Sequence, residues 1–237
     1  MLSHLSQAGL KVNANKSYFG CTETKYLGFW ITHQGIQPIA KKVEAIQQLQ
    51  PSKMHKQLCH FIGLINYYRD MWKHRLEALA PLSSLTSKNK KYQWTDTERK
   101  AFERIKSIVS KDILLSYPDF NKPFDIHTDA SKFQLGAVIS QNQKPIAFYS
   151  RKLNHAQTRY TMTERELLSI VETLKEFQNI LLGQQIRIFT DHQNLTYKGF
   201  NTERVMRWRL LIEEFAPEFT HILGKHNVVA DSLSRLE

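Results

Sequence analysis

The chain has only two cysteines and no long apolar run, and both absences restrict its class. Cys21 and Cys59 form no disulfide framework and are too few for a cysteine-rich zinc site, so we expect reduced thiols in an intracellular protein. No stretch approaches a membrane span, and no N-terminal segment has the layout of a signal peptide. The sequence therefore predicts a cytoplasmic or nuclear protein with no membrane partner.

What the chain does contain is an ordinary apolar content and an excess of positive charge that is unevenly distributed. Hydrophobic residues make up 41% of its 237 residues, which is typical of a globular protein and ample for two compact units. Residues 1–40 carry a net charge of +2, residues 41–117 carry 15 basic and 7 acidic residues, and residues 118–237 carry 15 and 14. The positive field of the middle segment predicts contact with nucleic-acid phosphates.

Four acidic residues each lie inside a short signature in the last half of the chain. They are Asp129 in FDIHTDAS, Glu166 in TERELLSIV, Asp191 in IRIFTDHQNL and Asp231 in NVVADSLSR. Period-two patterns predict that Asp129 and Asp191 lie at strand ends, whereas apolar residues at three- and four-residue steps place Glu166 on a helix. Converging carboxylates suit Mg²⁺, which prefers oxygen ligands.

Each acid also has an ordinary structural explanation. Glu166 lies three residues after Thr163, and Glu164 lies three after Thr161, so either pair could form a capping box. Aspartates at strand ends often form turns, and Asp231 could be a charge at a helix N-terminus. These explanations account for single residues, but they do not account for four signatures in one order.

The strings TDAS, GAVISQ, PIAFYSRKL, TERELLSIV, FTDH and GKHNVVADSLSR resemble, in order, the ribonuclease H domain of gypsy-class long-terminal-repeat retrotransposons. The resemblance implies an α/β fold, with a ribonuclease H-like mixed sheet flanked by helices. It also makes Asp129, Glu166, Asp191 and Asp231 the catalytic, metal-binding acids. His221 lies ten residues before Asp231, as a mobile histidine does in several ribonucleases H, although gypsy-class relatives often have another residue there.

This resemblance implies a Mg²⁺-dependent endonuclease that hydrolyses the RNA strand of RNA·DNA hybrids. Two Mg²⁺ ions, for which Mn²⁺ can substitute, would aim a water at the phosphorus and stabilise the leaving 3′ oxygen. The sequence by itself assigns no residue to the 2′ hydroxyl that distinguishes RNA from DNA.

The upstream half resembles the end of a reverse-transcriptase palm and the thumb of the same elements. The carrying strings are SQAGLKVNANKSYFGCTETKYLGFWITHQGI, then KKVEAIQQLQPSKMHKQLCHFIGLINYYRDMWK and YQWTDTERKAFERIK. We expect a palm remnant over residues 1–40, a mainly helical thumb or connection segment over 41–117, and a ribonuclease H-like domain over 118–237. Helical spacing in the middle segment predicts a core, and not a base-stacking surface, built from Leu58, Phe61, Ile62, Ile65, Tyr67, Tyr68 and Trp72. Tyr26, Leu27 and Gly28 match the primer-grip signature, although the same three residues are also typical of a strand that runs into a turn.

Lys88, Lys90 and Lys91 form the densest basic cluster, and we expect it to contact phosphates, although a solvated loop before a helix capped by Thr95 and Glu98 is often lysine-rich as well. No YxDD string occurs, so we expect no DNA synthesis by this chain alone. The expected partners are the missing polymerase portion and a primer/template duplex.

The alternative to the nuclease function is a catalytically silent nucleic-acid-binding or scaffold remnant of a retroelement. Intact acids favour the enzyme, and the truncated palm favours the remnant.

Overall fold

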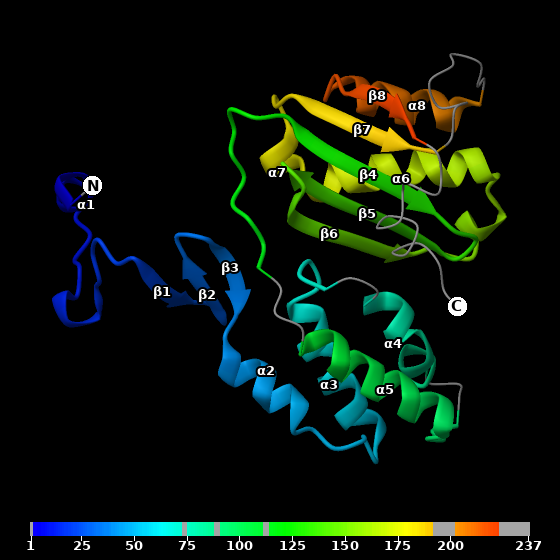
Figure 1. Cartoon of the computed structure of the whole chain (residues 1–237), viewed down its shortest axis with the longest axis horizontal. Helices are drawn as coiled ribbons and strands as arrows, with labels where there is room; N and C mark the ends of the chain where they lie inside the picture. Colours follow the sequence, from blue (N-terminus) through cyan, green and yellow to red (C-terminus); the bar gives the residue numbers. More distant parts are fainter. Residues whose placement is uncertain (1, 73–74, 88–90, 111–113, 192–201, 223–237) are drawn as a thin grey trace.

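The computed structural model describes residues 2–72, 75–87, 91–110, 114–191 and 202–222. Within these ranges the chain forms a small three-stranded sheet, a helical segment and a five-stranded sheet with helices packed on it (Figure 1). Among the described residues, no helix has the length and apolar character needed to cross a membrane.

The five-stranded sheet is mixed, with strands in the order β6-β5-β4-β7-β8. Strands β4, β5 and β6 of this sheet form an antiparallel meander. Strand β7 then pairs in parallel with the free side of β4, and β8 pairs in parallel with β7. Strands β4 and β5 form a hairpin, because β4 ends at Ala130 and the antiparallel β5 begins at Gln134. The strands are β4 Phe124–Ala130, β5 Gln134–Gln141, β6 Lys144–Lys152, β7 Ile186–Thr190 and β8 Glu218–His221.

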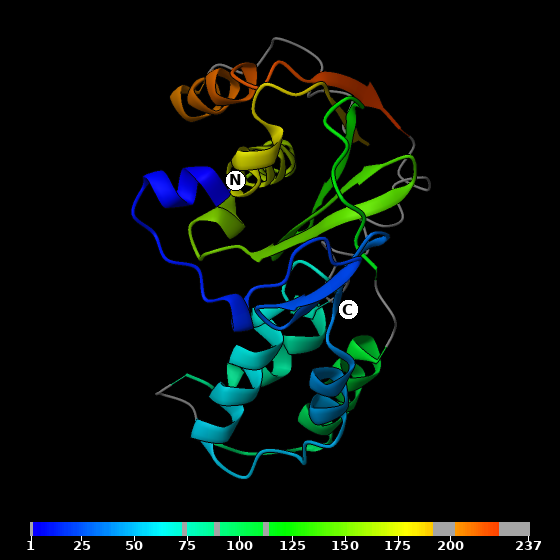
Figure 2. The ribbon, with the colours of Figure 1, turned by 90° about the vertical axis from the view of Figure 1, so that its left-hand side faces the viewer.

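Helices α6 and α8 cover one face of this sheet, as the turned view in Figure 2 shows. The apolar side of α6 is buried against β4 and β5, and α8 packs against α6. The capping box at the start of α6 joins Thr161 and Glu164, so Glu166 is not the capping residue and lies in the second turn. The helices are α6 Met162–Glu176, the short α7 Gln178–Leu181 and α8 Glu203–Glu213. The predicted α/β fold is confirmed.

The other face of β5 and β6 is covered by the helical segment. Side chains alternate between the faces of a strand, so Val138 and Phe148 point away from α6 and join the helical core instead. The backbone amide of Phe148 also donates to the carbonyl of Asp70 over 3.0 Å. The edge strand β6 is thereby held against the helical segment.

The helical segment has an aromatic core. Its helices are α2 Ala40–Gln47, α3 His55–Tyr67, α4 Arg75–Ser84 and α5 Asp96–Val109. Leu58, Phe61 and Ile65 of α3 are buried there with Tyr68 and Trp72, as the helical spacing predicted. Tyr67 is the exception, since it is 53% exposed. The predicted cap on α5 is present as a capping box between Thr95 and Glu98.

The N-terminal part is a short helix, α1 Leu2–Gln7, followed by the small antiparallel sheet. The strands are β1 Glu23–Tyr26, β2 Phe29–Thr32 and β3 Gly35–Pro38. Every residue of β1 is exposed. The sheet is attached to the rest of the protein at β3, where Ile36 exchanges two backbone hydrogen bonds with Leu115.

Candidate metal centre and nucleic-acid interface

Two of the acids lie on neighbouring strands at the same sheet edge. Asp129 is the penultimate residue of β4, and Asp191 directly follows β7. The two strands run parallel with His127 opposite Phe189, so the same register places residue 129 beside residue 191. Carboxyl ends of parallel strands meet at one edge, which is where open α/β sheets place ligands.

The third acid reaches this edge from helix α6. Glu166 Oε1 accepts a hydrogen bond from the backbone amide of Ala130 at 3.0 Å. One turn further on, the hydroxyl of Ser169 lies 3.1 Å from the carbonyl oxygens of both Asp129 and Gly136. These contacts fix α6 over the end of the β4–β5 hairpin, so the carboxylate of Glu166 is held close to that of Asp129.

The three acids form one compact group. Asp129, Glu166 and Asp191 each offer a carboxylate oxygen, and these oxygens lie within 4.8 Å of one another. Glu166 is fully buried and Asp129 is 5% exposed. Burial raises the pKa of Glu166 well above its usual range, and the negative charges of Asp129 and Asp191 raise it further.

A divalent cation fits this donor set. Three hard oxygen donors that repel one another are stabilised when a cation neutralises their charge, and Mg²⁺ takes such ligands. The group could therefore hold a divalent metal ion.

The fourth predicted acid, Asp231, lies outside the described residues. His221 ends β8, is exposed, and its Nε2 lies 3.1 Å from the carbonyl oxygen of Asp191. The predicted histidine is thus close to the acidic group, through a contact with the backbone of Asp191.

The primer-grip-like residues form a tight turn between β1 and β2. Leu27 and Gly28 have φ angles of 44° and 81°, the left-handed conformation that both central residues of a type I′ hairpin turn require. The side chains of Tyr26 and Leu27 are 61% and 67% exposed. The turn that sequence reasoning weighed as an alternative is therefore present, and two large apolar side chains are accessible on it.

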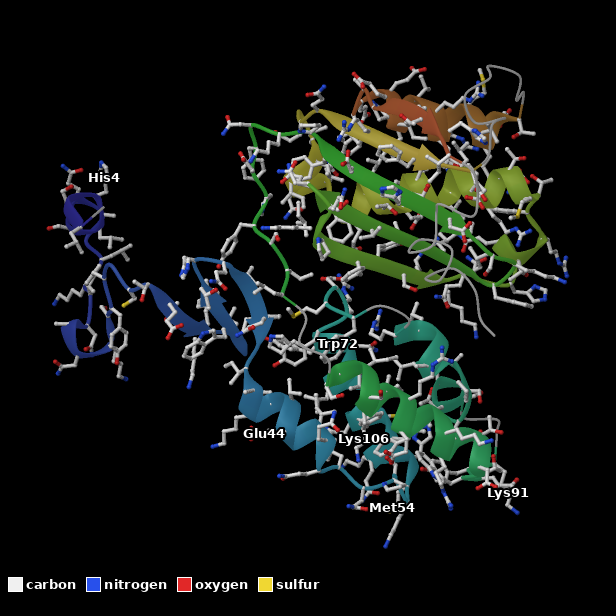
Figure 3. The ribbon with its side chains drawn as sticks, in the orientation of Figure 1. His4, Glu44, Met54, Trp72, Lys91 and Lys106 are labelled. Atoms are coloured by element: carbon white, nitrogen blue, oxygen red, sulfur yellow. The ribbon has the colours of Figure 1, made fainter. Side chains whose placement is uncertain are left out.

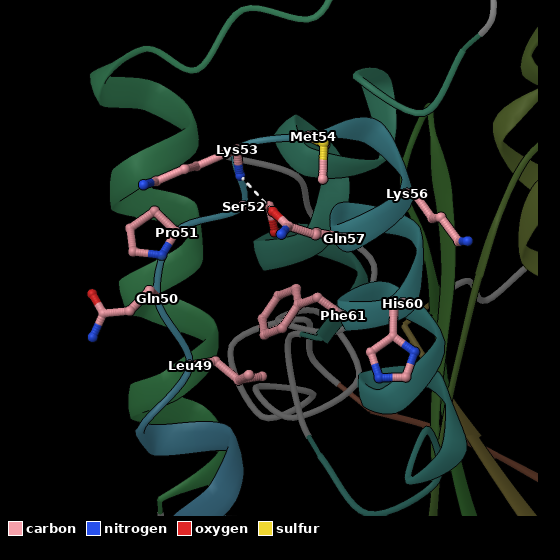
Figure 4. Close-up of a pocket in the computed structure, with 10 residues that line it drawn as sticks. All are labelled: Leu49, Gln50, Pro51, Ser52, Lys53, Met54, Lys56, Gln57, His60 and Phe61. Carbon is pink, nitrogen blue, oxygen red and sulfur yellow. Dashed lines mark hydrogen bonds between the residues drawn. The ribbon is translucent and has the colours of Figure 1, made fainter.

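Of the predicted lysine cluster only Lys91 is described; Lys88 and Lys90 lie outside the described residues. Lys91 is exposed and lies at the end of the helical segment that is remote from the five-stranded sheet (Figure 3). A groove of about 620 Å³ lies between the α2–α3 connection and α3. Its lining includes the apolar Leu49 and Phe61 and the basic Lys53 and Lys56 (Figure 4).

Sequence reasoning missed two sets of contacts around these sites. Ser169, which fixes α6 over Asp129, gave no signal because a serine on a helix is common. Tyr67 and Tyr68 were assigned to the core of the helical segment, yet both hydroxyls bond to the β1–β2 turn. Such pairings join residues 40 positions apart, so no local pattern could reveal them.

The mixed sheet, its helical layer and its acidic edge define a ribonuclease H-like α/β domain. Residues 94–188 match the family described as "RNase H-like domain found in reverse transcriptase". The chain thus carries a domain related to nucleases and reverse transcriptases.

The particular relatives are retrotransposon polyproteins. The whole chain aligns with 38% identity to the Retrovirus-related Pol polyprotein from transposon opus of Drosophila melanogaster, and covers 25% of it. It is also 38% identical to the corresponding polyprotein from transposon gypsy, over 99% of the chain and 24% of that polyprotein. The resemblance to gypsy-class Pol polyproteins is confirmed, and the chain spans about a quarter of the length of these relatives.

Solved structures agree with this assignment. The foamy viral protease-reverse transcriptase dRH, solved in complex with double-stranded DNA, superposes with a TM-score of 0.76 and 25% identity over 93% of this chain and 41% of that one. The same viral protein in complex with an RNA/DNA hybrid gives a TM-score of 0.75 and 25% identity, over 89% of this chain and 30% of that one.

Proposed function

We propose that this chain hydrolyses the RNA strand of RNA·DNA hybrids, as the nuclease part of a retrotransposon reverse transcriptase. The observation that carries the proposal is the convergence of Asp129, Glu166 and Asp191, whose carboxylate oxygens lie within 4.8 Å of one another at the edge of the sheet. The similarity to a foamy viral protein solved with an RNA/DNA hybrid supports the choice of substrate.

The acids would hold two Mg²⁺ ions, with Mn²⁺ as a substitute and Asp231 as a fourth ligand. When bound, the ions would activate a water and stabilise the charge on the leaving 3′ oxygen. The protein itself holds the three carboxylates in position. Asp129 and Asp191 are fixed by adjacent strands, and Glu166 is fixed by its bond to the amide of Ala130.

The helical segment would hold the hybrid duplex while the acidic group at the sheet edge cuts its RNA strand. Residues 41–117 carry the net charge of +8, whereas residues 118–237 are nearly neutral. We infer that Lys88, Lys90 and Lys91 contact phosphates and that Tyr26, Leu27 and Gly28 contact the primer strand. A division into a palm remnant over 1–40, a thumb over 41–117 and a nuclease domain over 118–237 follows from the same assignment, with the remaining polymerase portion as a partner.

The experiment that tests the nuclease uses a hybrid labelled on its RNA strand, with Mg²⁺. Asp191→Asn removes a ligand charge and should lower the cleavage rate by at least about 100-fold, the scale of losing a group that stabilises the transition state. Asp125→Asn is the matched control, because Asp125 lies on the neighbouring strand β4 but pairs with Arg187, at 2.6 Å, and lies outside the acidic group. Cleavage that survives Asp191→Asn would contradict the proposal.

Binding gives the second measurement. Lys91→Ala should reduce the slope of log affinity against log salt by about one, since one phosphate contact is lost. Binding of hybrid without cleavage by any variant or by the unmodified chain would instead establish the second candidate, a silent nucleic-acid-binding remnant, which the positive charge of residues 41–117 also supports.

A further inference from the structure

The β1–β2 turn is held from outside its own sheet by two adjacent tyrosine hydroxyls. Tyr67 and Tyr68 are the last residue and the C-cap of α3. The hydroxyl of Tyr67 donates to the carbonyl of Leu27, and that of Tyr68 donates to the carbonyl of Gly28 at 3.0 Å. Both carbonyls of the turn's central residues therefore have a partner on α3.

The rings that carry these hydroxyls are themselves fixed. The Tyr67 ring stacks on Phe29 with centroids 5.8 Å apart, and the Tyr68 ring meets the same Phe29 edge-on at 5.2 Å. A Cβ on Gly28 would lie 3.1 Å from the Tyr68 hydroxyl. The glycine thus permits both the left-handed backbone and the close approach of Tyr67 and Tyr68, which together we call the tyrosine clamp.

The same short stretch of chain also contacts the five-stranded sheet. Arg69 forms an ion pair with Glu176 at the end of α6, and the carbonyl of Asp70 accepts the amide of Phe148 in β6. Direct packing between the two sheets is incomplete, because a cavity of about 330 Å³ lies between Phe29 and Phe177. Four consecutive residues, 67–70, therefore connect the turn with the sheet that carries the acids.

We propose that the hydroxyls of Tyr67 and Tyr68 position the β1–β2 turn relative to the acidic edge, and so determine where an RNA strand is cut relative to the primer end. The inference rests on the proposed function. The tyrosines are positioning residues: the groups that would touch the nucleic acid are the exposed Tyr26 and Leu27. Without the two hydroxyls, the Gly28 carbonyl still accepts the backbone amide of Ile39 at 3.3 Å, so the turn keeps its fold but is held less firmly in its direction.

The test is the double variant Tyr67→Phe/Tyr68→Phe, which removes both hydroxyls and keeps both rings. The substrate is a hybrid with a recessed DNA 3′ end, and cut positions on the labelled RNA are mapped together with kcat and KM. We expect cuts that spread over neighbouring positions, a KM raised about fivefold to tenfold, the scale of losing one or two hydrogen bonds, and an unchanged kcat. On a long hybrid without a nearby DNA end, the KM should not change.

Tyr117→Phe is the matched control. Its hydroxyl donates to the carbonyl of Thr32 at 2.7 Å, at the opposite turn of the same small sheet. The two backbone bonds between Ile36 and Leu115 remain there, so cuts should stay at the positions of the unmodified chain. An unchanged cut pattern and KM in the double variant would overturn the inference, and so would an equal spread of cuts in Tyr117→Phe.

Affinity for a primer/template duplex with a recessed 3′ end separates this inference from the nuclease proposal. If the unmodified chain binds that duplex but cleaves no hybrid, the nuclease proposal fails, and an affinity loss of about fivefold to tenfold in the double variant still supports positioning of the turn. Equal affinity of both proteins for the duplex would overturn it.

Discussion

The two sheets of this protein differ in how they are stabilised. Every residue of β1 in the small sheet is exposed, whereas seven of the eight residues of β5 in the large sheet are buried. The large sheet is covered by α6 on one face and, at β5 and β6, by the helical segment on the other. The small sheet depends on contacts at its ends, made by Tyr67, Tyr68 and Leu115. The large sheet is buried and can therefore hold its acidic side chains in fixed positions. The small sheet is held at its ends and its strand β1 is exposed, so its side chains can contact a partner.

The largest expected difference between the two sheets is in the free energy of unfolding, measured for one isoleucine-to-alanine substitution in each sheet. Ile126→Ala in β4 removes a fully packed side chain and should lower the free energy of unfolding by about 2–5 kcal/mol. Ile31→Ala in β2 should cost about 1 kcal/mol, because Ile31 is only partly buried. Urea unfolding followed by circular dichroism measures both, and equal losses would contradict the comparison.

Gly35→Ala tests the attachment of the small sheet. A Cβ there would lie 2.2 Å from the carbonyl oxygen of Leu115, and the φ of 152° disfavours any side chain, so we expect a loss of about 1–3 kcal/mol. Exchange of the Ile36 amide, which donates to that carbonyl, should speed up. Gly9→Ala is the control, since its φ is 70° but no atom lies within 4 Å. If Ile36 exchanges no faster in Gly35→Ala than in the control, the attachment is not at this contact.

Glu166→Gln should have opposite effects on stability and on metal binding. Because the folded-state pKa of Glu166 is raised, its contribution to stability is present below its usual pKa and is lost as the pH rises through the raised value. In EDTA, at a pH above the raised value, the neutral amide should therefore give a higher melting temperature than the ionised carboxylate. Added Mg²⁺ should stabilise this variant less than the unmodified chain.

Glu172→Gln is the control for that measurement, as it lies on the same helix but pairs with Arg151 at 3.3 Å. It should not raise the melting temperature in EDTA. A higher melting temperature in Glu172→Gln, or none in Glu166→Gln, would show that the burial of Glu166 and its repulsion by Asp129 and Asp191 are not the cause.

The smallest expected effect concerns the helix that carries the tyrosine clamp. Gly63 lies within α3, and no atom would meet an added Cβ within 4 Å. Gly63→Ala should therefore stabilise the helix by about 0.5–1 kcal/mol, which corresponds to a rise of about 1–4 °C in melting temperature. Differential scanning calorimetry measures it, and a lower melting temperature would show that the position is more crowded than the structure indicates.

Much of the fold followed from local patterns. The alternation before Asp129 predicted β4, the spacing of Leu167 and Leu174 predicted α6, and the Thr95–Glu98 pair predicted the start of α5. Among the described acids, the sequence identified the three that the structure brings together. The roles assigned to them, to Asp231 and to the basic and primer-grip-like residues stay predictions.

The sequence by itself determined β4, β7, α6, the start of α5 and the order of the four acidic signatures, because hydrophobic periodicity and capping act over a few residues. Only the tertiary structure decided that Glu166 lies against Ala130, that Val138 and Phe148 belong to the helical core, and that Tyr68 bonds to Gly28. These contacts join residues that are far apart in the chain. They depend on how buried faces pack together, and a pattern within one segment holds no information about which other segment will cover it.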